Sequence, residues 1–262
     1  MAEPQVQTGR TFRSALGDTR YIAILPKRYT DPAAAHRRYP VIYLTHGIGG
    51  HEDEWLKGSG IARYAAGREV ILVSADAAQR CYVDSFDGSS LCETMAARDL
   101  VEFVDATYRT LPRKEGRGLM GLSMGGYGAL YLSLRHPHTF AAAVSLSGAL
   151  MIGQLILGEA RPDLAHVDSL FPPTLIGREQ WDLFTQLRIA PATVRQSLRW
   201  KLLCGTGDNL IEINRAFHHY ALARGVGHQY DEYPGKHDWP FWDEHAAESL
   251  DFLAGHLAGA EG

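Results

Sequence analysis

The stretch Leu119-Met120-Gly121-Leu122-Ser123-Met124-Gly125-Gly126 decides the fold prediction, because it joins an apolar run to a helical segment through a serine flanked by glycines. It matches the G-x-S-x-G nucleophile elbow, a sharp strand-to-helix turn that exposes the serine hydroxyl. The glycines leave room around a serine whose backbone is strained in such a turn. The alternative is a glycine-rich turn with an ordinary exposed serine, since three fixed letters occur by chance in a chain with 27 glycines. Ser123 is the candidate nucleophile.

Apolar runs alternate with helical periodicity on both sides of this stretch. Uninterrupted runs at 41–44, 70–73 and 119–122 predict strands buried on both faces. Extended segments at 11–16 and 21–26 flank Gly17-Asp18 and predict a hairpin. Further strands are expected at 141–146, 200–204 and 228–233, and helices at 93–111, 125–135, 210–224 and 241–256. The pattern predicts one α/β domain over residues 1–262, with a mostly parallel sheet of about eight strands flanked by helices.

Residues 148–198 break the alternation, since about fifty residues separate two predicted strands there. The segment carries Leu155, Leu157, Trp181 and Phe184. We expect it to form a small helical cap insertion over the sheet edge where ligands bind. The alternative is that it packs flat, with Trp181 and Phe184 as core residues.

A serine nucleophile needs a base and an acid that orients the base, and after an elbow of this kind these follow in the order acid, then histidine. Asp208 comes directly after a predicted strand, and His237 lies in the loop before the last helix. We therefore expect His237 to be the base and Asp208 the acid. Asp208 has a second interpretation as the cap of the helix that begins near Leu210, a role that Asn209 could fill instead.

The loop His46-Gly47-Ile48-Gly49-Gly50 follows a predicted strand, at a place that supplies an oxyanion-hole amide in such folds. We expect the donors to be the amides of Ile48 and Met124, with Gly49 as the alternative to Ile48. His46 ends the strand and is expected to be a buried, hydrogen-bonded structural residue.

A group of glycines and aromatic residues is expected to contact substrate. It consists of Gly47, Gly49, Trp55, Trp181, Phe184 and Trp239. For Trp239, which stands beside Phe241 and Trp242, anchoring of the last helix in the core is the favoured alternative.

Composition excludes several function classes. Lys and Arg number 26 against 30 Asp and Glu, a formal net charge of -4, which offers no basic surface for nucleic acid. No apolar run approaches the roughly 20 residues that cross a bilayer, and the N-terminus lacks a signal-peptide pattern. The sequence as given therefore predicts a cytoplasmic protein with no membrane partner. If a signal peptide has been removed the protein is secreted, and Cys81 could then pair with Cys92.

Metal-binding patterns are weak. His218-His219 has no acidic or cysteine partner at ligand spacing, and Glu52-Asp53-Glu54 is expected to be a solvated loop or helix start. We expect no metal.

The chain resembles an esterase family of α/β-hydrolases that includes feruloyl and acetylxylan esterases, tributyrin-type esterases, S-formylglutathione hydrolases and mycolyltransferases. The resemblance covers nearly the whole chain and is carried by residues 43–50 with Trp55, 99–109, 121–129, 205–208 and 235–239. It implies the α/β-hydrolase fold and no organic cofactor. It also implies a serine carboxylesterase for small-molecule esters, feruloyl-type aryl esters among them. If the cap encloses the acyl pocket, we expect that pocket to be short and to favour acetyl to butyryl groups. In mycolyltransferases the residue after the loop's first glycine donates an oxyanion amide, which corresponds to Ile48. Acyl transfer to a sugar or other alcohol is the alternative activity, and a homo-oligomer stays open.

Overall fold

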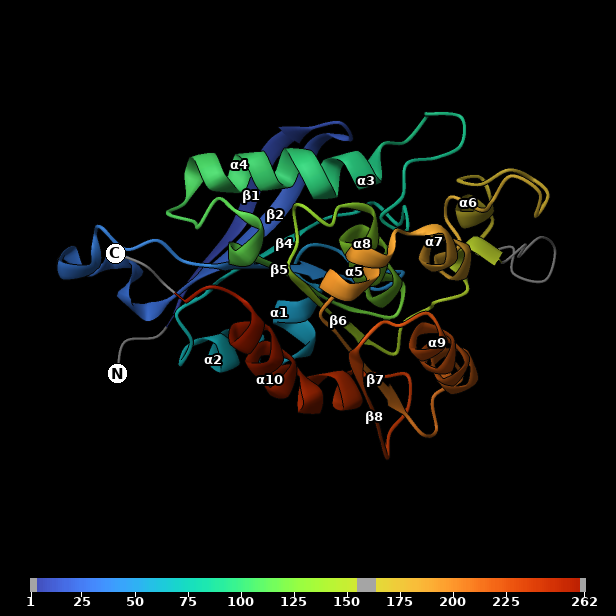
Figure 1. The fold of residues 1–262 in the computed structure, drawn as a ribbon. Coiled ribbons are helices and arrows are strands. Elements are labelled where there is room, and N and C mark those ends of the chain that lie inside the picture. The colour runs from blue at the N-terminus through green and yellow to red at the C-terminus, as the bar shows by residue number, and fades with distance from the viewer. Residues whose placement is uncertain (1–3, 155–163, 260–262) are drawn as a thin grey trace.

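The computed structural model describes residues 4–154 and 164–259 (Figure 1). In these residues eight strands form one sheet, in the order β1-β2-β4-β3-β5-β6-β7-β8. The strands are β1 (Gln5–Ser14), β2 (Gly17–Leu25), β3 (Val41–Thr45), β4 (Ile71–Ala75), β5 (Arg117–Leu122), β6 (Ala142–Leu146), β7 (Trp200–Gly205) and β8 (His228–Tyr233). Strands β1 and β2 form the predicted hairpin, β2 pairs antiparallel with β4, and every other neighbouring pair is parallel.

Helices cover both faces of this sheet. The α-helices are α1 (Glu54–Gly58), α2 (Ile61–Ala65), α3 (Cys92–Thr94), α4 (Leu100–Thr107), α5 (Met124–Arg135), α6 (Ala165–Asp168), α7 (Leu183–Ile189), α8 (Ala192–Ser197), α9 (Ile211–Ala223) and α10 (Trp239–His256). Shorter 3-10 and π turns are η1 (Lys27–Thr30), η2 (Pro32–Ala34), η3 (Met95–Asp99), η4 (Lys114–Gly116) and η5 (Ile152–Gln154). Figure 1 shows α3 and α4 on one side of the sheet and α1, α2 and α10 on the other.

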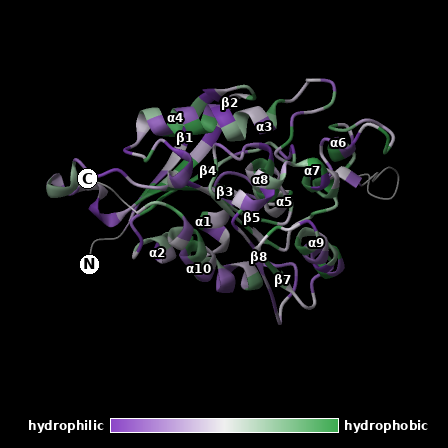
Figure 2. Ribbon diagram, in the orientation of Figure 1, coloured by the Kyte–Doolittle hydropathy of each residue, from purple (hydrophilic) through white to green (hydrophobic). Residues whose placement is uncertain are grey.

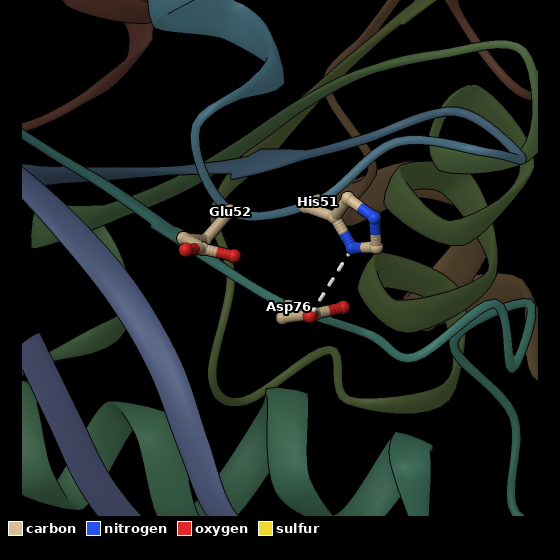
Figure 3. Close-up of side chains that lie close together, drawn as sticks. All are labelled: His51, Glu52 and Asp76. Carbon is tan, nitrogen blue, oxygen red and sulfur yellow. Dashed lines mark hydrogen bonds and ion pairs between the residues drawn. The ribbon is translucent and has the colours of Figure 1, made fainter. Parts of the chain in front are cut away.

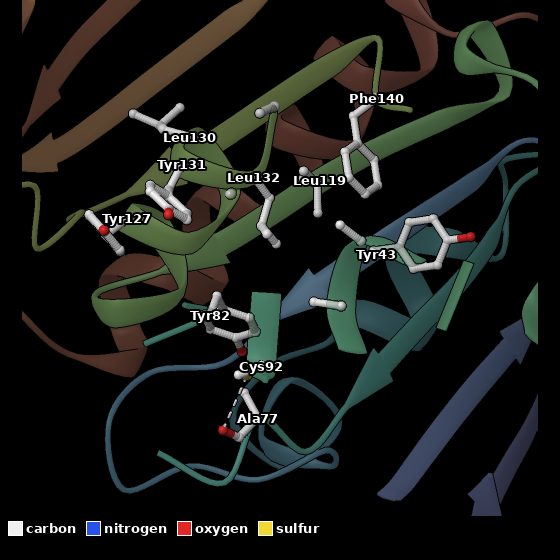
Figure 4. Packing of buried hydrophobic residues seen from close by; sticks show 14 of the residues in the cluster. Tyr43, Ala77, Tyr82, Cys92, Leu119, Tyr127, Leu130, Tyr131, Leu132 and Phe140 are labelled. Carbon is white, nitrogen blue, oxygen red and sulfur yellow. Dashed lines mark hydrogen bonds between the residues drawn. The ribbon is translucent and has the colours of Figure 1, made fainter. Parts of the chain in front are cut away.

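The apolar runs of the central strands are explained by this double cover. In β3 the side chains of Val41 and Tyr43 belong to the core on the α4 and α5 side, whereas Ile42 and Leu44 belong to the core on the α10 side. Figure 4 shows part of the first core, where Tyr43 lies near Phe140. Helices α9 and α10 interleave hydrophobic and hydrophilic residues along their lengths, as expected for helices that bury one face (Figure 2).

The helix predicted at 93–111 is shorter than expected. It runs through α3, η3 and α4 and ends at Thr107. The next residues are extended instead, because Thr110 forms a β-bridge with Tyr39 and the Leu111 amide donates to the Tyr39 carbonyl. Pairing with a neighbouring segment therefore replaces the last helical turn.

The segment between β6 and β7 contains η5, α6, α7 and α8 in its described part. Leu155 and Leu157, expected to belong to the cap, lie outside the described residues. Trp181 is a buried core residue, and Phe184 is partly buried and packs against the core. Trp181 is 2% exposed and contacts Phe171, and Phe184 packs against Phe217 of α9. Among the described helices none is long and apolar enough to cross a membrane.

Candidate active site

Ser123 stands in a strained turn between β5 and α5. Its φ of 53° and ψ of -119° lie in a region that non-glycine residues rarely adopt. A Cβ atom at Gly121 would lie 2.0 Å from the Thr45 hydroxyl, and one at Gly125 would lie 2.2 Å from the Thr45 carbonyl oxygen. The two glycines therefore let the elbow pack directly against the end of β3, which explains their place in the motif.

Ser123, His237 and Asp208 form a hydrogen-bonded chain at the carboxyl ends of the strands. The Ser123 hydroxyl lies 3.0 Å from His237 Nε2, and His237 Nδ1 lies 2.9 Å from Asp208 Oδ2. Asp208 follows β7 and His237 follows β8, so the topology brings together residues that are far apart in the sequence. The chain has the geometry needed to move a proton from serine to imidazole.

Asp208 is 3% exposed and stays ionised. Burial opposes its charge, but hydrogen bonds from His237, Ser147 and the Leu210 amide outweigh burial and hold the pKa of the carboxyl below its usual value. The bond to Leu210, 2.7 Å long, lies at the start of α9. The N-cap residue of α9 is Leu210, so neither Asp208 nor Asn209 occupies the cap position. Asp208 bonds the Leu210 amide as well as His237.

Ser147 and Trp242 support this pair. The Trp242 indole donates to the Ser147 hydroxyl at 3.1 Å, and Ser147 in turn bonds Asp208. The ring of Trp242 also meets His237 edge-on, with 5.0 Å between centroids. For the cluster that contains Trp242, the sequence suggests either an anchor for the last helix or a substrate wall. The position of Trp242 five residues after His237, in the first turn of α10, is the signal for its contact with the imidazole.

The loop after β3 reaches Ser123. A Cβ atom at Gly47 would lie 3.6 Å from Ser123 Cβ. Three of the loop's amides are already committed: Gly47 donates to Glu54 at 2.8 Å, Gly49 donates to Gln79, and Gly50 donates to the Gly47 carbonyl. Within the described residues no acceptor faces the Ile48 amide. Of the two open alternatives, this arrangement supports Ile48 over Gly49 as an oxyanion donor, beside the Met124 amide at the start of α5.

His46 is fully buried and both of its ring nitrogens are engaged. Nδ1 donates to the Gly47 carbonyl at 2.8 Å, and Nε2 accepts the Ala77 amide at 2.9 Å. Burial lowers the pKa of its imidazole, so the ring is neutral. The structural role expected for His46 agrees with this geometry.

A cavity of about 480 Å³ opens beside Ser123 and His237. We call it the Ser123 cavity. Residues of the segment between β6 and β7, among them Met151, Ile152 and Val167, form an apolar wall. Ile48 borders the same space. The site can therefore place an apolar group next to the serine hydroxyl.

The aromatic residues expected to contact substrate lie elsewhere. Trp55 is fully buried and donates to the Thr45 carbonyl, so it supports the end of β3 from inside the core. Trp181 donates to the Asp84 carbonyl, and neither it nor Phe184 lines the Ser123 cavity. Trp239 forms, with Gly49, one side of a separate groove of about 400 Å³. The expectation of substrate contact is therefore wrong for Trp55 and Trp181, which fill core positions, and for Phe184, which packs against the core.

The cysteines do not pair. Cys81 and Cys92 are both buried and free, and Cys81 lines the Ser123 cavity. Burial raises the pKa of the Cys81 thiol to about 12, so it is protonated and unreactive at neutral pH.

One cluster of potential metal ligands lies beside the loop after β3. His51, Glu52 and Asp76 offer ligand atoms within 4.8 Å of one another (Figure 3). Arg20 pairs with both carboxylates, 3.3 Å from Glu52 and 2.7 Å from Asp76, so a guanidinium already neutralises one of their two negative charges. The predicted helix start is right, since α1 begins at Glu54, but Glu52 is buried at 9% exposure rather than solvated.

Comparison with known proteins identifies the family of the chain. Residues 14–253 match the family described as "Putative esterase". An acetyl esterase of Caldicellulosiruptor saccharolyticus is 25% identical over 250 residues, covering 90% of this chain and 93% of that protein. Esterase Rv1288 of Mycobacterium tuberculosis is 30% identical over 262 residues, covering 90% of this chain but 56% of that longer protein.

Among solved structures, a ferulic acid esterase superposes with a TM-score of 0.83 at 23% identity, covering 97% of this chain and all of that chain. This likeness shows the α/β-hydrolase fold. The match over nearly the full length therefore leads to one conclusion: the chain belongs to this esterase family of α/β-hydrolases and is an enzyme that acts on ester bonds.

Proposed function

We propose that the protein is a serine carboxylesterase that works through an acyl-enzyme on Ser123. The observation that carries the proposal is the hydrogen-bonded chain from Ser123 through His237 to the ionised Asp208, with distances of 3.0 and 2.9 Å. The turn at Ser123 adds support, because its strained backbone conformation places the serine hydroxyl beside an apolar cavity.

The reaction begins when the Ser123 oxygen attacks the ester carbonyl and His237 Nε2 takes the serine proton. Asp208 accepts the Nδ1 hydrogen bond and stabilises the imidazolium that forms. The amides of Ile48 and Met124 bind the tetrahedral oxyanion, each worth about 3 kcal/mol in the transition state. His237 then protonates the leaving alcohol. A water molecule, activated by the same imidazole, releases the acid and regenerates Ser123.

The acyl group that fits best is short. The described part of the segment between β6 and β7 acts as a cap within one domain, and its side chains Met151, Ile152 and Val167 limit the Ser123 cavity. We propose acetyl to butyryl esters as substrates, with feruloyl-type aryl esters as the second class. Hydrolysis is favoured over acyl transfer, because the relatives from Caldicellulosiruptor saccharolyticus and Mycobacterium tuberculosis are both described as esterases.

The experiment is a rate series on p-nitrophenyl esters of increasing acyl length. Val167→Phe, which adds volume inside the cavity, should move the optimum to a shorter chain. Trp181→Ala is the matched control, because Trp181 lies outside the cavity. A wild-type rate that is highest for long acyl chains, or a preferred chain length that is the same in Val167→Phe, contradicts the proposed acyl class. Addition of glycerol as an acceptor separates the two activities, since a transferase forms a new ester in preference to free acid.

A further inference from the structure

The loop that follows β4 contains four non-glycine residues with positive φ. These are Ala78 at 47°, Gln79 at 62°, Cys81 at 53° and Tyr82 at 58°. Such conformations cost free energy at each residue and persist only when surrounding contacts fix them. The contacts of this loop therefore indicate what its strained shape accomplishes.

Most of these contacts are made to the loop after β3 that borders Ser123. The Ala77 amide donates to His46 Nε2 at 2.9 Å, and the Tyr82 hydroxyl accepts the His46 amide at 2.6 Å. Gln79 accepts the Gly49 amide with its side-chain oxygen and donates its side-chain nitrogen to the Gly50 carbonyl at 2.8 Å. The strained loop thus binds its neighbour at both ends.

The strained loop is itself held firmly. The Ala78 amide donates to Asp76, and the Cys92 thiol donates to the Ala77 carbonyl, as Figure 4 shows beside Tyr82. A Cβ atom at Gly128 would lie 2.4 Å from the Tyr82 ring, so this ring packs directly on α5. The support for the loop after β3 therefore connects to the same helix that begins behind Ser123.

Glu54 holds the loop from its other side. Its carboxylate accepts the Gly47 amide at 2.8 Å. A Cβ atom at Gly50 would lie 2.3 Å from that carboxylate, so the loop backbone packs against it. Together Glu54 and Gln79 engage the amides on either side of Ile48 in the sequence, those of Gly47 and Gly49.

We propose that Gln79 and Glu54 are positioning residues that aim the Ile48 amide at the oxyanion formed on Ser123. The inference rests on the proposed serine mechanism and names residues outside its triad. Neither side chain touches the reacting atoms. Each accepts a hydrogen bond from an amide next to Ile48. Of these three loop amides, only that of Ile48 then stays available for the oxyanion, and its direction is fixed during the reaction.

The test compares Gln79→Met, which keeps side-chain length but cannot bond the loop, with Gln196→Met on α8 as the matched control, because Gln196 is exposed. For Gln79→Met, kcat for p-nitrophenyl acetate should fall about 10- to 100-fold, the range expected when an oxyanion donor is displaced, with KM unchanged. The affinity for a trifluoromethyl ketone, which forms a tetrahedral adduct on the serine, should fall by the same factor. Rates are expressed per site titrated with a fluorophosphonate, so that loss of folded protein does not count.

The proposal is overturned if Gln79→Met has the wild-type kcat per titrated site, or if its affinity for the ketone is unchanged. If Gln79→Met does not fold, Glu54→Met and Glu54→Gln replace it. The Gln variant keeps an acceptor for the Gly47 amide and should retain the wild-type kcat, whereas the Met variant should lose it. Equal kcat values in the two overturn the proposal as well. Ser123→Ala separates failure of the serine mechanism from failure of the positioning role. Activity in Ser123→Ala refutes the serine mechanism itself. If Ser123→Ala is inactive and Gln79→Met keeps the wild-type kcat, only the positioning role is refuted.

Discussion

Asp208→Asn removes a charge while nearly preserving the size of the side chain. Both carboxylate oxygens accept hydrogen bonds: Oδ1 takes the Leu210 amide at 2.7 Å, and Oδ2 takes His237 Nδ1 at 2.9 Å. An asparagine has one acceptor oxygen, so in either orientation its NH₂ group faces a donor. Facing Leu210, it leaves a buried donor without a partner, which costs about 1–3 kcal/mol of stability.

Facing His237, the NH₂ group selects the imidazole tautomer that carries its proton on Nε2. That nitrogen lies 3.0 Å from the Ser123 hydroxyl and can then no longer accept the serine proton. The expected loss in kcat is about 10³- to 10⁴-fold, equivalent to about 4–5.5 kcal/mol of transition-state stabilisation. The assay is p-nitrophenyl acetate hydrolysis, with the melting temperature measured in parallel.

Asp238→Asn is the matched control. Asp238 caps α10 by accepting the Phe241 amide, and asparagine is an equally good cap. Activity should therefore stay close to that of the wild type. A loss at Asp208 of less than about tenfold, far below the value expected for a tautomer change, or a larger loss at Asp238, would refute the assignment of the acid.

Three further predictions follow from the same structure. Trp181→Ala should destabilise the fold by about 3–5 kcal/mol in chemical denaturation and leave the acyl-length profile unchanged, because Trp181 fills the core; a changed profile would return it to the cavity wall. Because the folded-state pKa of Asp208 is lowered, its ionised form stabilises the fold above the unfolded pKa, and this contribution is lost as pH falls. The melting-temperature gap between wild type and Asp208→Asn should therefore narrow below about pH 4, and a gap that widens there would contradict the pKa direction. EDTA should leave ester hydrolysis unchanged, since Arg20 already pairs with Glu52 and Asp76; activity lost in EDTA and restored by a divalent ion would show that a metal takes part.

The sheet could be predicted from the sequence because the signals for its strands are local. An apolar run without alternation identifies a strand covered on both faces, as in β3 and β5, and the elbow at Ser123 needs only the residues next to it. The positions of Asp208 and His237 followed from chain order, because strands that run parallel end at the same edge. These inferences depend on periodicity and topology, which a single sequence carries.

The remaining features depend on contacts between segments far apart in the chain. Trp181 and Phe184 are aromatic, as a cavity wall would require, but contact with Phe171 places Trp181 in the core and contact with Phe217 places Phe184 against it. Gln79 lies in a loop with positive φ angles but without a glycine that would have indicated them in the sequence. No local signal therefore predicted the hydrogen bonds of Gln79 with Gly49 and Gly50. A polar residue in an irregular loop reveals its role only when its partner is known.

The most direct test of the serine mechanism is peptide mapping of the protein after reaction with a fluorophosphonate. The hydroxyl of Ser123 lies 3.0 Å from His237 Nε2, so it should be activated and react at one adduct per chain. We predict that the adduct is found on the peptide containing Ser123, that it is absent in Ser123→Ala and His237→Ala, and that ester hydrolysis falls in proportion to labelling. Full labelling at another residue, or undiminished hydrolysis by fully labelled protein, would contradict the account.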